Sequence, residues 1–178
     1  LKNKNLLLCV TGSIAAYKAC ELLRLLRKEE ANVQVMMSKS AEKFVGKASF
    51  AALSNNEVLT SLFPKNPPAG LKHVNLAFEL DAVIIAPATA NIICKAAGGI
   101  ADDIISTTLS ICDVPKLFAP AMNFNMWQNK STIDSVDILK ERNYSIISPE
   151  EGQLASLHKG TGRLADLNKI MNGIKKLF

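Results

Sequence analysis

This 178-residue chain contains few aromatic residues and no long apolar segment. Phe, Trp and Tyr together make up 6% of it, so aliphatic side chains must build most of the interior. Hydrophobic residues make up 48% and charged residues 21%, which is typical of a globular protein with a sizeable core. The longest apolar run is far shorter than a membrane span, and no secretory signal opens the chain. We therefore expect a single domain over residues 1–178 and no membrane partner.

Histidine and cysteine are scarce, and their spacing does not suit a metal. The two histidines, His73 and His158, lie far apart, and the four cysteines include no Cys-x-x-Cys pair. The sequence therefore predicts neither a metal site nor a disulfide framework. Free, mostly buried thiols suit a reducing compartment, so we expect a cytoplasmic location.

Basic residues are in excess but form no cluster. The net charge is +5, and lysines and arginines are scattered along the chain without interleaved aromatics. This pattern argues against nucleic-acid binding. A mildly basic chain does favour small anionic ligands such as phosphates.

Short apolar runs alternate with helical patterns along most of the chain. Strands are predicted over residues 5–11, 33–37, 81–86, 116–119 and 144–147. Helices are predicted over residues 14–28, 40–44, 47–54, 89–97, 102–109, 132–142 and 167–177. Residues 64–70 read as a proline-rich loop, and residues 150–162 as a long polar loop. The alternation predicts one doubly wound α/β domain, Rossmann-like or flavodoxin-like, with a parallel sheet and helices on both faces.

Polar residues follow four of the predicted strands. Gly12 and Ser13 follow the first, Ser38 the second, Thr89 the third and Asn123 the fourth. The first of these turns lacks the Gly-x-Gly-x-x-Gly pattern, but a glycine, a hydroxyl and a helix amino terminus suit a phosphate. A mononucleotide fits this turn better than a dinucleotide, while an ordinary serine N-cap is the alternative.

The run from Pro120 to Trp127 is the most distinctive stretch. Pro120 should end the fourth strand, and an amide, two thioethers and an indole then follow on an expected loop. Such a loop suits a flat aromatic cofactor and a small polar substrate, or it covers its own core with Met and Trp. His73 can take a proton from a thiol or hold a carboxylate, although a lone histidine is more often a surface or cap residue. Asp102 and Asp103 are interpreted as helix-start carboxylates.

Several of these runs, taken in order, match a known family. They are Thr11-Gly-Ser-Ile-Ala-Ala-Tyr-Lys18, His73-Val-Asn-Leu76, Ala86-Pro-Ala-Thr-Ala-Asn91, Gly99-Ile-Ala-Asp-Asp-Ile-Ile-Ser-Thr107, Pro120-Ala-Met-Asn123 with Met126-Trp127, and Gly160-Thr-Gly-Arg163. The chain resembles the flavin-dependent cysteine decarboxylases, a family that includes the phosphopantothenoylcysteine decarboxylases of coenzyme A synthesis. The resemblance implies FMN as the cofactor and decarboxylation of 4′-phosphopantothenoylcysteine to 4′-phosphopantetheine. The start at Leu1 fits the amino-terminal half of a bifunctional enzyme, with a stand-alone enzyme as the alternative.

The resemblance also implies roles for individual residues. His73 matches the catalytic base, and Asn123 matches the residue that binds the substrate's carboxylate and amide. Met126 and Ala155 join Asn123 as substrate-binding residues. The cofactor-binding positions are Gly12, Ser13, Ile14, Ser38, Phe44, Pro87, Ala88, Thr89, Ala90, Thr107 and Ala121. Members of the family are homotrimers or dodecamers with FMN at a subunit interface, so His73 is expected to reach a neighbour's flavin.

In the implied reaction, His73 assists removal of the thiol proton and the sulfur-bearing carbon loses a hydride to the flavin. Carbon dioxide then leaves from a thioaldehyde, and an acid in the late loop protonates the enethiol as it is reduced. In the coenzyme A enzymes this acid is a cysteine, and aligning on Gly152 and Gly160 puts Ser156 there. Ser156 fits an introduced replacement, a natural relative that stops after oxidative decarboxylation of a peptide's cysteine, or a register shift of a few residues. A non-catalytic regulatory flavoprotein is a further alternative, against which His73 and Asn123 argue.

Overall fold

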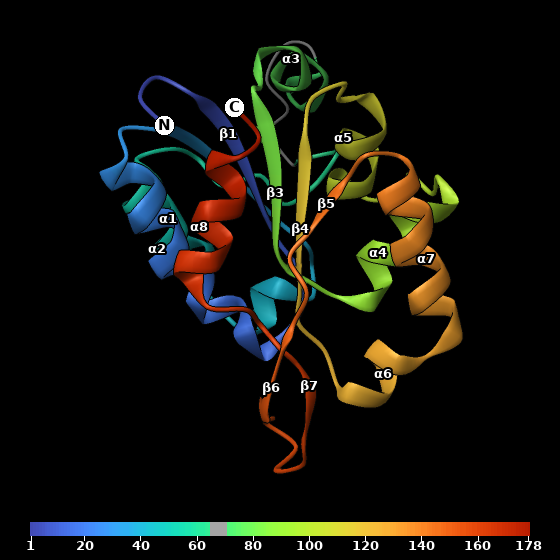
Figure 1. Ribbon diagram of the computed structural model, residues 1–178. Helices are drawn as coiled ribbons and strands as arrows, with labels where there is room; N and C mark the ends of the chain where they lie inside the picture. The colour runs from blue at the N-terminus through green and yellow to red at the C-terminus, as the bar shows by residue number, and fades with distance from the viewer. Residues whose placement is uncertain (65–70) are drawn as a thin grey trace.

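A five-stranded parallel sheet forms the centre of the molecule (Figure 1). The computed structural model describes residues 1–64 and 71–178. The strand order is β2-β1-β3-β4-β5. The strands are β1 (Asn5–Val10), β2 (Asn32–Met37), β3 (Ala82–Ala88), β4 (Lys116–Pro120) and β5 (Ser145–Ile146). The predicted doubly wound α/β fold is therefore confirmed.

Helices cover both faces of the sheet (Figure 1). One face carries α1 (Lys18–Lys28), α2 (Lys47–Ser54) and α8 (Leu167–Lys175). The other carries α3 (Lys72–Glu79), α4 (Ala90–Gly98), α5 (Ile104–Ile111) and α7 (Lys130–Glu141). The remaining elements are two 3₁₀ turns, η1 (Ile14–Tyr17) and η2 (Ala41–Lys43), the short α6 (Phe124–Gln128), and the strands β6 (Glu150–Gln153) and β7 (Lys159–Arg163).

The central strands β1 and β3 are apolar almost throughout because both of their faces are buried. In β1, Leu6 and Leu8 pack with α1, α2 and α8, whereas Leu7 and Cys9 pack with the helices on the other face. All four side chains have no exposed surface. A strand between two helical layers reads as one continuous hydrophobic run, which is why the sequence located these strands well.

Residues 150–162 were predicted as a long polar loop, and this prediction is wrong. The segment forms an antiparallel hairpin in which Gly152 pairs with Gly160, and it extends beyond the carboxyl ends of the parallel strands (Figure 1). Its strands carry no apolar alternation, because glycines and charged residues occupy them. Pairing between β6 and β7 and contact with the β4 exit, rather than hydrophobic patterning, hold this hairpin.

Two proline boundaries also differ from expectation. Pro87 was predicted to follow the third strand, but β3 continues to Ala88, and the pairing with β4 shifts between Ile85 and Ala88. Proline has no N–H for a ladder, and the strand resumes after it when Ala88 pairs with Pro120. The segment after Pro120 was expected to be a loop, yet Phe124–Gln128 forms α6. The predicted proline-rich loop lies, apart from Pro64, outside the described residues.

Within residues 1–64 and 71–178, no helix combines the length and the apolar character needed to cross a bilayer.

Candidate active site

The strand order places a crevice between the exits of β1 and β3. These neighbouring strands lead into connections that run to opposite sides, and ligands of open α/β sheets bind at such a switch point. Two cavities, of about 450 Å³ and about 730 Å³, open at this edge. They share Gly12, Thr89 and Met126 in their walls, so they meet around the first βα turn.

The first βα turn presents unused hydrogen-bond donors. Ser13 caps η1 by accepting the Ala15 N–H at 3.3 Å, which leaves its own hydroxyl proton free. Across the described part of the chain, the N–H groups of Gly12 and Ile14 have no acceptor. A Cβ at Gly12 would lie 2.3 Å from the Ser40 Cβ, so only glycine fits here. Free N–H groups at a helix start form a site for an anion such as a phosphate.

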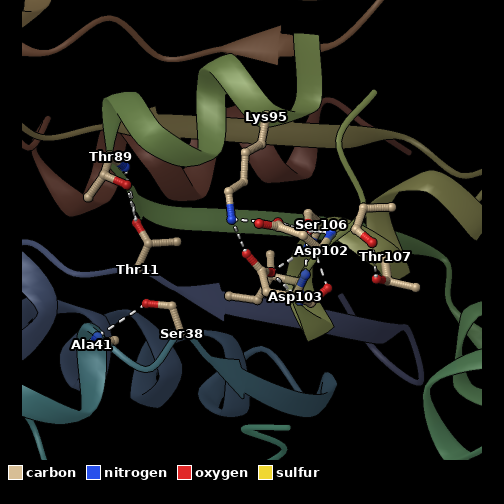
Figure 2. Close-up of polar contacts among 11 residues, drawn as sticks. Thr11, Ser38, Ala41, Thr89, Lys95, Asp102, Asp103, Ser106 and Thr107 are labelled. Carbon is tan, nitrogen blue, oxygen red and sulfur yellow. Dashed lines mark hydrogen bonds and ion pairs between the residues drawn. The ribbon is translucent and has the colours of Figure 1, made fainter. Parts of the chain in front are cut away.

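Thr11 fastens this turn to the exit of β3. Its buried hydroxyl donates to the Pro87 carbonyl at 2.7 Å and accepts the Thr89 N–H at 3.0 Å, and its contact with the Thr89 hydroxyl is drawn in Figure 2. The backbone adds a bond from the Thr11 N–H to the same Pro87 carbonyl. Two walls of the crevice are therefore held together by one side chain.

Ser38 brings a second hydroxyl to the same edge, at the exit of β2. Its Oγ accepts the Ala41 N–H at 3.1 Å, as Figure 2 shows, and its hydroxyl proton stays available to a ligand. Ser38 lines the larger cavity, which Gly12 also lines. The exits of β1 and β2 thus offer hydroxyl and backbone donors to one region of space.

Asn123 faces the smaller cavity from the exit of β4. Its Oδ1 caps α6 by accepting the Asn125 N–H at 2.9 Å, which fixes the orientation of the amide. The Nδ2 group then points its donors away from the cap. In the chain as described, Nδ2 has no acceptor, so it can bind a carboxylate.

The β6–β7 hairpin forms another wall of the smaller cavity. Ala155 and Ser156, at its tip, line this cavity together with Asn123. The hairpin contacts the β4 exit closely, because a Cβ at Gly162 would lie 2.2 Å from the Met122 oxygen and one at Gly160 would lie 2.8 Å from the Phe124 Cβ. The two glycines of β7 therefore allow the hairpin to approach the residues around Asn123.

An ion-pair cluster forms part of the larger cavity's wall. Lys95 contacts Asp102 at 2.6 Å and Asp103 at 2.7 Å, and Asp103 also caps α5 by accepting the Ile105 and Ser106 N–H groups (Figure 2). Burial would raise the pKa of the Asp103 carboxyl, but hydrogen bonds from Lys95 and Ser106 outweigh burial and hold that pKa below its ordinary value. The helix-start interpretation of Asp103 is confirmed.

The structure brings most of the predicted site residues to this edge. The smaller cavity is lined by Gly12, Ser13, Ile14, Phe44, Thr89, Ala121, Asn123, Met126, Ala155 and Ser156. Ser38 lines the larger cavity. Pro87 and Ala88 are buried strand residues, Ala90 starts α4, and none of these three lines either cavity.

His73 and Thr107 line neither cavity. His73 is on α3, which leads into the amino end of β3, and Thr107 is on α5, which packs against α3. Exposed apolar side chains lie on or beside these two helices, with Leu71 57% and Phe78 79% exposed. Within one chain, His73 is therefore not at the cavity that Asn123 faces.

Two basic residues of the smaller cavity were not predicted as site residues. Lys18 and Arg163 both line it. Each stands at the end of a run that carried the family resemblance. The sequence therefore pointed to both residues, although neither was given a role in binding or catalysis. Met122, beside Asn123, was missed in the same way.

Fold and site together define an α/β domain that can bind a mononucleotide. Donors for a phosphate lie at the β1 exit, while Ile14, Phe44 and Met126 provide apolar surface for a flat ring. The residues present therefore fit a flavin mononucleotide. The chain belongs to the Flavoprotein family, whose sequence profile matches residues 1–178.

Relatives and solved structures agree with this assignment. The chain is 43% identical over 178 residues to the coenzyme A biosynthesis bifunctional protein CoaBC of Bacillus subtilis (strain 168), covering all of this chain and 44% of that protein. It is 39% identical over 175 residues to a probable phosphopantothenoylcysteine decarboxylase of Streptococcus mutans, covering 97% of this chain and 98% of that one. A cysteine-to-serine mutant of PPC decarboxylase complexed with pantothenoylaminoethenethiol superposes with a TM-score of 0.85 at 30% identity, covering 98% of each chain. The chain spans less than half the length of the bifunctional relative.

Proposed function

We propose that this chain is an FMN-dependent decarboxylase that converts 4′-phosphopantothenoylcysteine to 4′-phosphopantetheine in the synthesis of coenzyme A. One observation carries the proposal: the anion-binding turn, Asn123 and Ser156 all line one cavity at the β1/β3 switch point. The similarity to a probable phosphopantothenoylcysteine decarboxylase over nearly the full length of both chains supports it. Residues 1–178 act as one FMN-binding domain in the cytoplasm, either alone or as part of a bifunctional protein.

The residues at the strand exits hold FMN. The Gly12 and Ile14 N–H groups and the Ser13 and Ser38 hydroxyls donate to its phosphate. Phe44, Thr89 and Ala121 bound the space beside its ring. When bound, FMN supplies a hydride acceptor for oxidation of the cysteine's sulfur-bearing carbon.

The chain's own residues orient the substrate and move protons. Asn123 donates from Nδ2 to the substrate's cysteinyl carboxylate, and the cap that Asn125 makes with Oδ1 keeps the amide in that orientation. The hairpin that carries Ser156 bounds the same cavity. His73 takes the thiol proton as general base.

His73 reaches the site of a neighbouring subunit. Its position on α3, outside the lining of its own chain's cavity, supports a site that a second copy completes. Exposed Leu71 and Phe78 provide apolar surface near it for such a contact. The assembly is a homo-oligomer, a trimer or dodecamer, with FMN at the subunit interface.

The function is tested by adding 4′-phosphopantothenoylcysteine to the FMN-loaded protein and following carbon dioxide release and the flavin absorption spectrum. We expect carbon dioxide release and transient bleaching of the flavin. A protein that stays colourless with added FMN, or that leaves this substrate intact, would contradict the proposal.

The shared site is tested by mixing variants. His73→Asn and Asn123→Asp protein should each bind FMN but lack decarboxylation. Co-expression of the two should restore part of the activity, because some interfaces then pair an intact His73 with an intact Asn123 from different chains. If the mixture recovers no activity, His73 and Asn123 of one site must come from the same chain.

Oxidative decarboxylation of a peptide's carboxyl-terminal cysteine is the second candidate. Ser156 favours it, because a serine hydroxyl is a far poorer proton donor than a thiol and the enethiol would then be the final product. A peptide ending in cysteine that reduces the flavin, where 4′-phosphopantothenoylcysteine does not, would establish this candidate instead.

A further inference from the structure

The charged residues that line the smaller cavity, within the described chain, are both basic. They are Lys18, the first residue of α1, and Arg163, the last residue of β7. No aspartate or glutamate of the described chain lines this cavity. A substrate that carries its only negative charge on the cysteinyl carboxylate would need one donor set, which Asn123 already provides. Because Asn123 accounts for the carboxylate, the cations Lys18 and Arg163 indicate a further anionic group on the bound ligands.

Arg163 is held in place by neighbours on β6. Its guanidinium crosses the strand at Gly152, where an added Cβ would lie 3.2 Å from Nη1 and 3.4 Å from Cζ. Its Nη2 lies 3.5 Å from the Glu150 carboxylate. Glu150 is also engaged by the Asp166 N–H at 3.2 Å and by Lys169 at 3.5 Å. The long and shared contact with Glu150 orients the guanidinium but leaves most of its five donors unused.

The position of Arg163 separates it from the turn that suits the cofactor's phosphate. The turn lies at the exit of β1, whereas Arg163 reaches the cavity from the hairpin that carries Ser156. Guanidinium forks bind phosphate oxygens with two parallel hydrogen bonds. The cavity thus has two sets of donors suited to a phosphate, one at the β1 exit and one on the hairpin.

We propose that Arg163 binds the phosphate of the substrate, at the end remote from its cysteine, and thereby selects phosphorylated substrates over unphosphorylated ones. This inference rests on the proposed function, because it assigns the anion that the same cavity receives. Asn123 holds the carboxylate end and Arg163 the phosphate end, so the two residues together set the direction in which the substrate lies. The cofactor's phosphate is the other possible source of such an anion, and the experiment separates the two.

The test is calorimetric binding to the FMN-loaded protein, with 4′-phosphopantetheine and pantetheine as paired probes. The unaltered protein should prefer the phosphorylated probe, and Arg163→Gln should weaken its binding by about tenfold to about a hundredfold while leaving pantetheine unaffected. Arg163→Lys should recover part of the loss, since it restores charge without the fork. In turnover, kcat/KM for 4′-phosphopantothenoylcysteine should fall by the same factor, and that for pantothenoylcysteine should stay unchanged.

Lys169→Gln is the matched control. Lys169 contacts the same Glu150 carboxylate at the same 3.5 Å but does not line the cavity, so its loss should alter neither probe's affinity. Equal weakening of both probes in Arg163→Gln would overturn the inference, as would weaker FMN binding in a fluorescence titration of the apoprotein. Failure of the proposed function has a different signature: the unaltered protein would release no carbon dioxide, whatever its preference between the two probes.

Discussion

The Met122 N–H donates to the Gly162 carbonyl at 2.9 Å and so joins the exit of β4 to strand β7. Through this bond, the residues before Asn123 and the hairpin that carries Ser156 and Arg163 share one rigid junction. The close contact of Gly162 with Met122 makes the junction sensitive to a single methyl group.

Gly162→Ala is expected to disrupt this junction. The new Cβ would meet the Met122 oxygen at 2.2 Å, and backbone on both sides must move. Overpacking of this kind costs about 1–3 kcal/mol of unfolding free energy, and displacement of the hairpin should lower kcat/KM by about a hundredfold. Urea unfolding and steady-state kinetics measure the two effects. Gly46→Ala is the control, because nothing lies within 4 Å of a Cβ there. Equal stability and equal kcat/KM in the two variants would show that the contact of Gly162 with Met122 does not matter.

Asn123→Asp separates the two roles of the Asn123 amide. The aspartate keeps an oxygen that accepts the Asn125 N–H, so α6 should retain its stability. It replaces the Nδ2 donors with negative charge facing the substrate carboxylate, and decarboxylation should fall by at least about a hundredfold. Circular dichroism and carbon dioxide release check the two expectations. An active Asn123→Asp protein would remove Asn123 from carboxylate binding.

Ser156→Cys should change the product rather than the rate of carbon dioxide release. A thiol, with an ordinary pKa of about 8.5, can donate the proton that reduction of the enethiol needs, whereas a hydroxyl is a far poorer donor. Mass spectrometry should show a larger share of the saturated thiol, relative to the enethiol, from Ser156→Cys than from the unaltered protein. Ser148→Cys, at an exposed position that lines neither cavity, is the control and should leave the products unchanged. Identical products from both variants would show that residue 156 is not at the protonation site.

Asp103→Asn should remove a pH-dependent part of the protein's stability. The pKa of Asp103 is lowered in the folded state, so its charge stabilises the fold above its unfolded pKa of about 3.9 and that contribution is lost as pH falls through the lower folded value. Asparagine keeps the cap of α5 but loses the pair with Lys95, which at this half-exposed site contributes about 1 kcal/mol or less. Urea midpoints of the two proteins should differ at about pH 7 and converge at acid pH.

Asp103→Ala provides the comparison for that measurement. It also removes the oxygen that accepts the Ile105 and Ser106 N–H groups, so the free energy of unfolding should be lower by about 1 kcal/mol at every pH. A difference between Asp103→Asn and the unaltered protein that persists undiminished into acid would assign the stabilisation to something other than the charge.

The sequence predicted the sheet and the meeting of polar residues at the strand exits. The central apolar runs, such as the one that contains Leu7 and Leu8, are buried on both faces, and burial of this kind leaves a continuous pattern that can be read locally. Strand exits in a parallel sheet meet at one edge, so Ser13, Thr89 and Asn123 could be expected to converge before the fold was known. His73 could be singled out by type, and the family resemblance led us to expect it outside the cavity of its own chain, where the structure has it.

The sequence by itself determined the α/β alternation, the chemistry at the strand exits and the family, because those depend on local patterns of burial and on contiguous runs of residues. Only the tertiary structure decided that residues 150–163 form a hairpin and that Arg163 lines the same cavity as Asn123. The reason is physical: a polar, glycine-rich segment has no hydrophobic period, and its position follows from close contacts of Gly160 and Gly162 with Phe124 and Met122, which are distant in the chain.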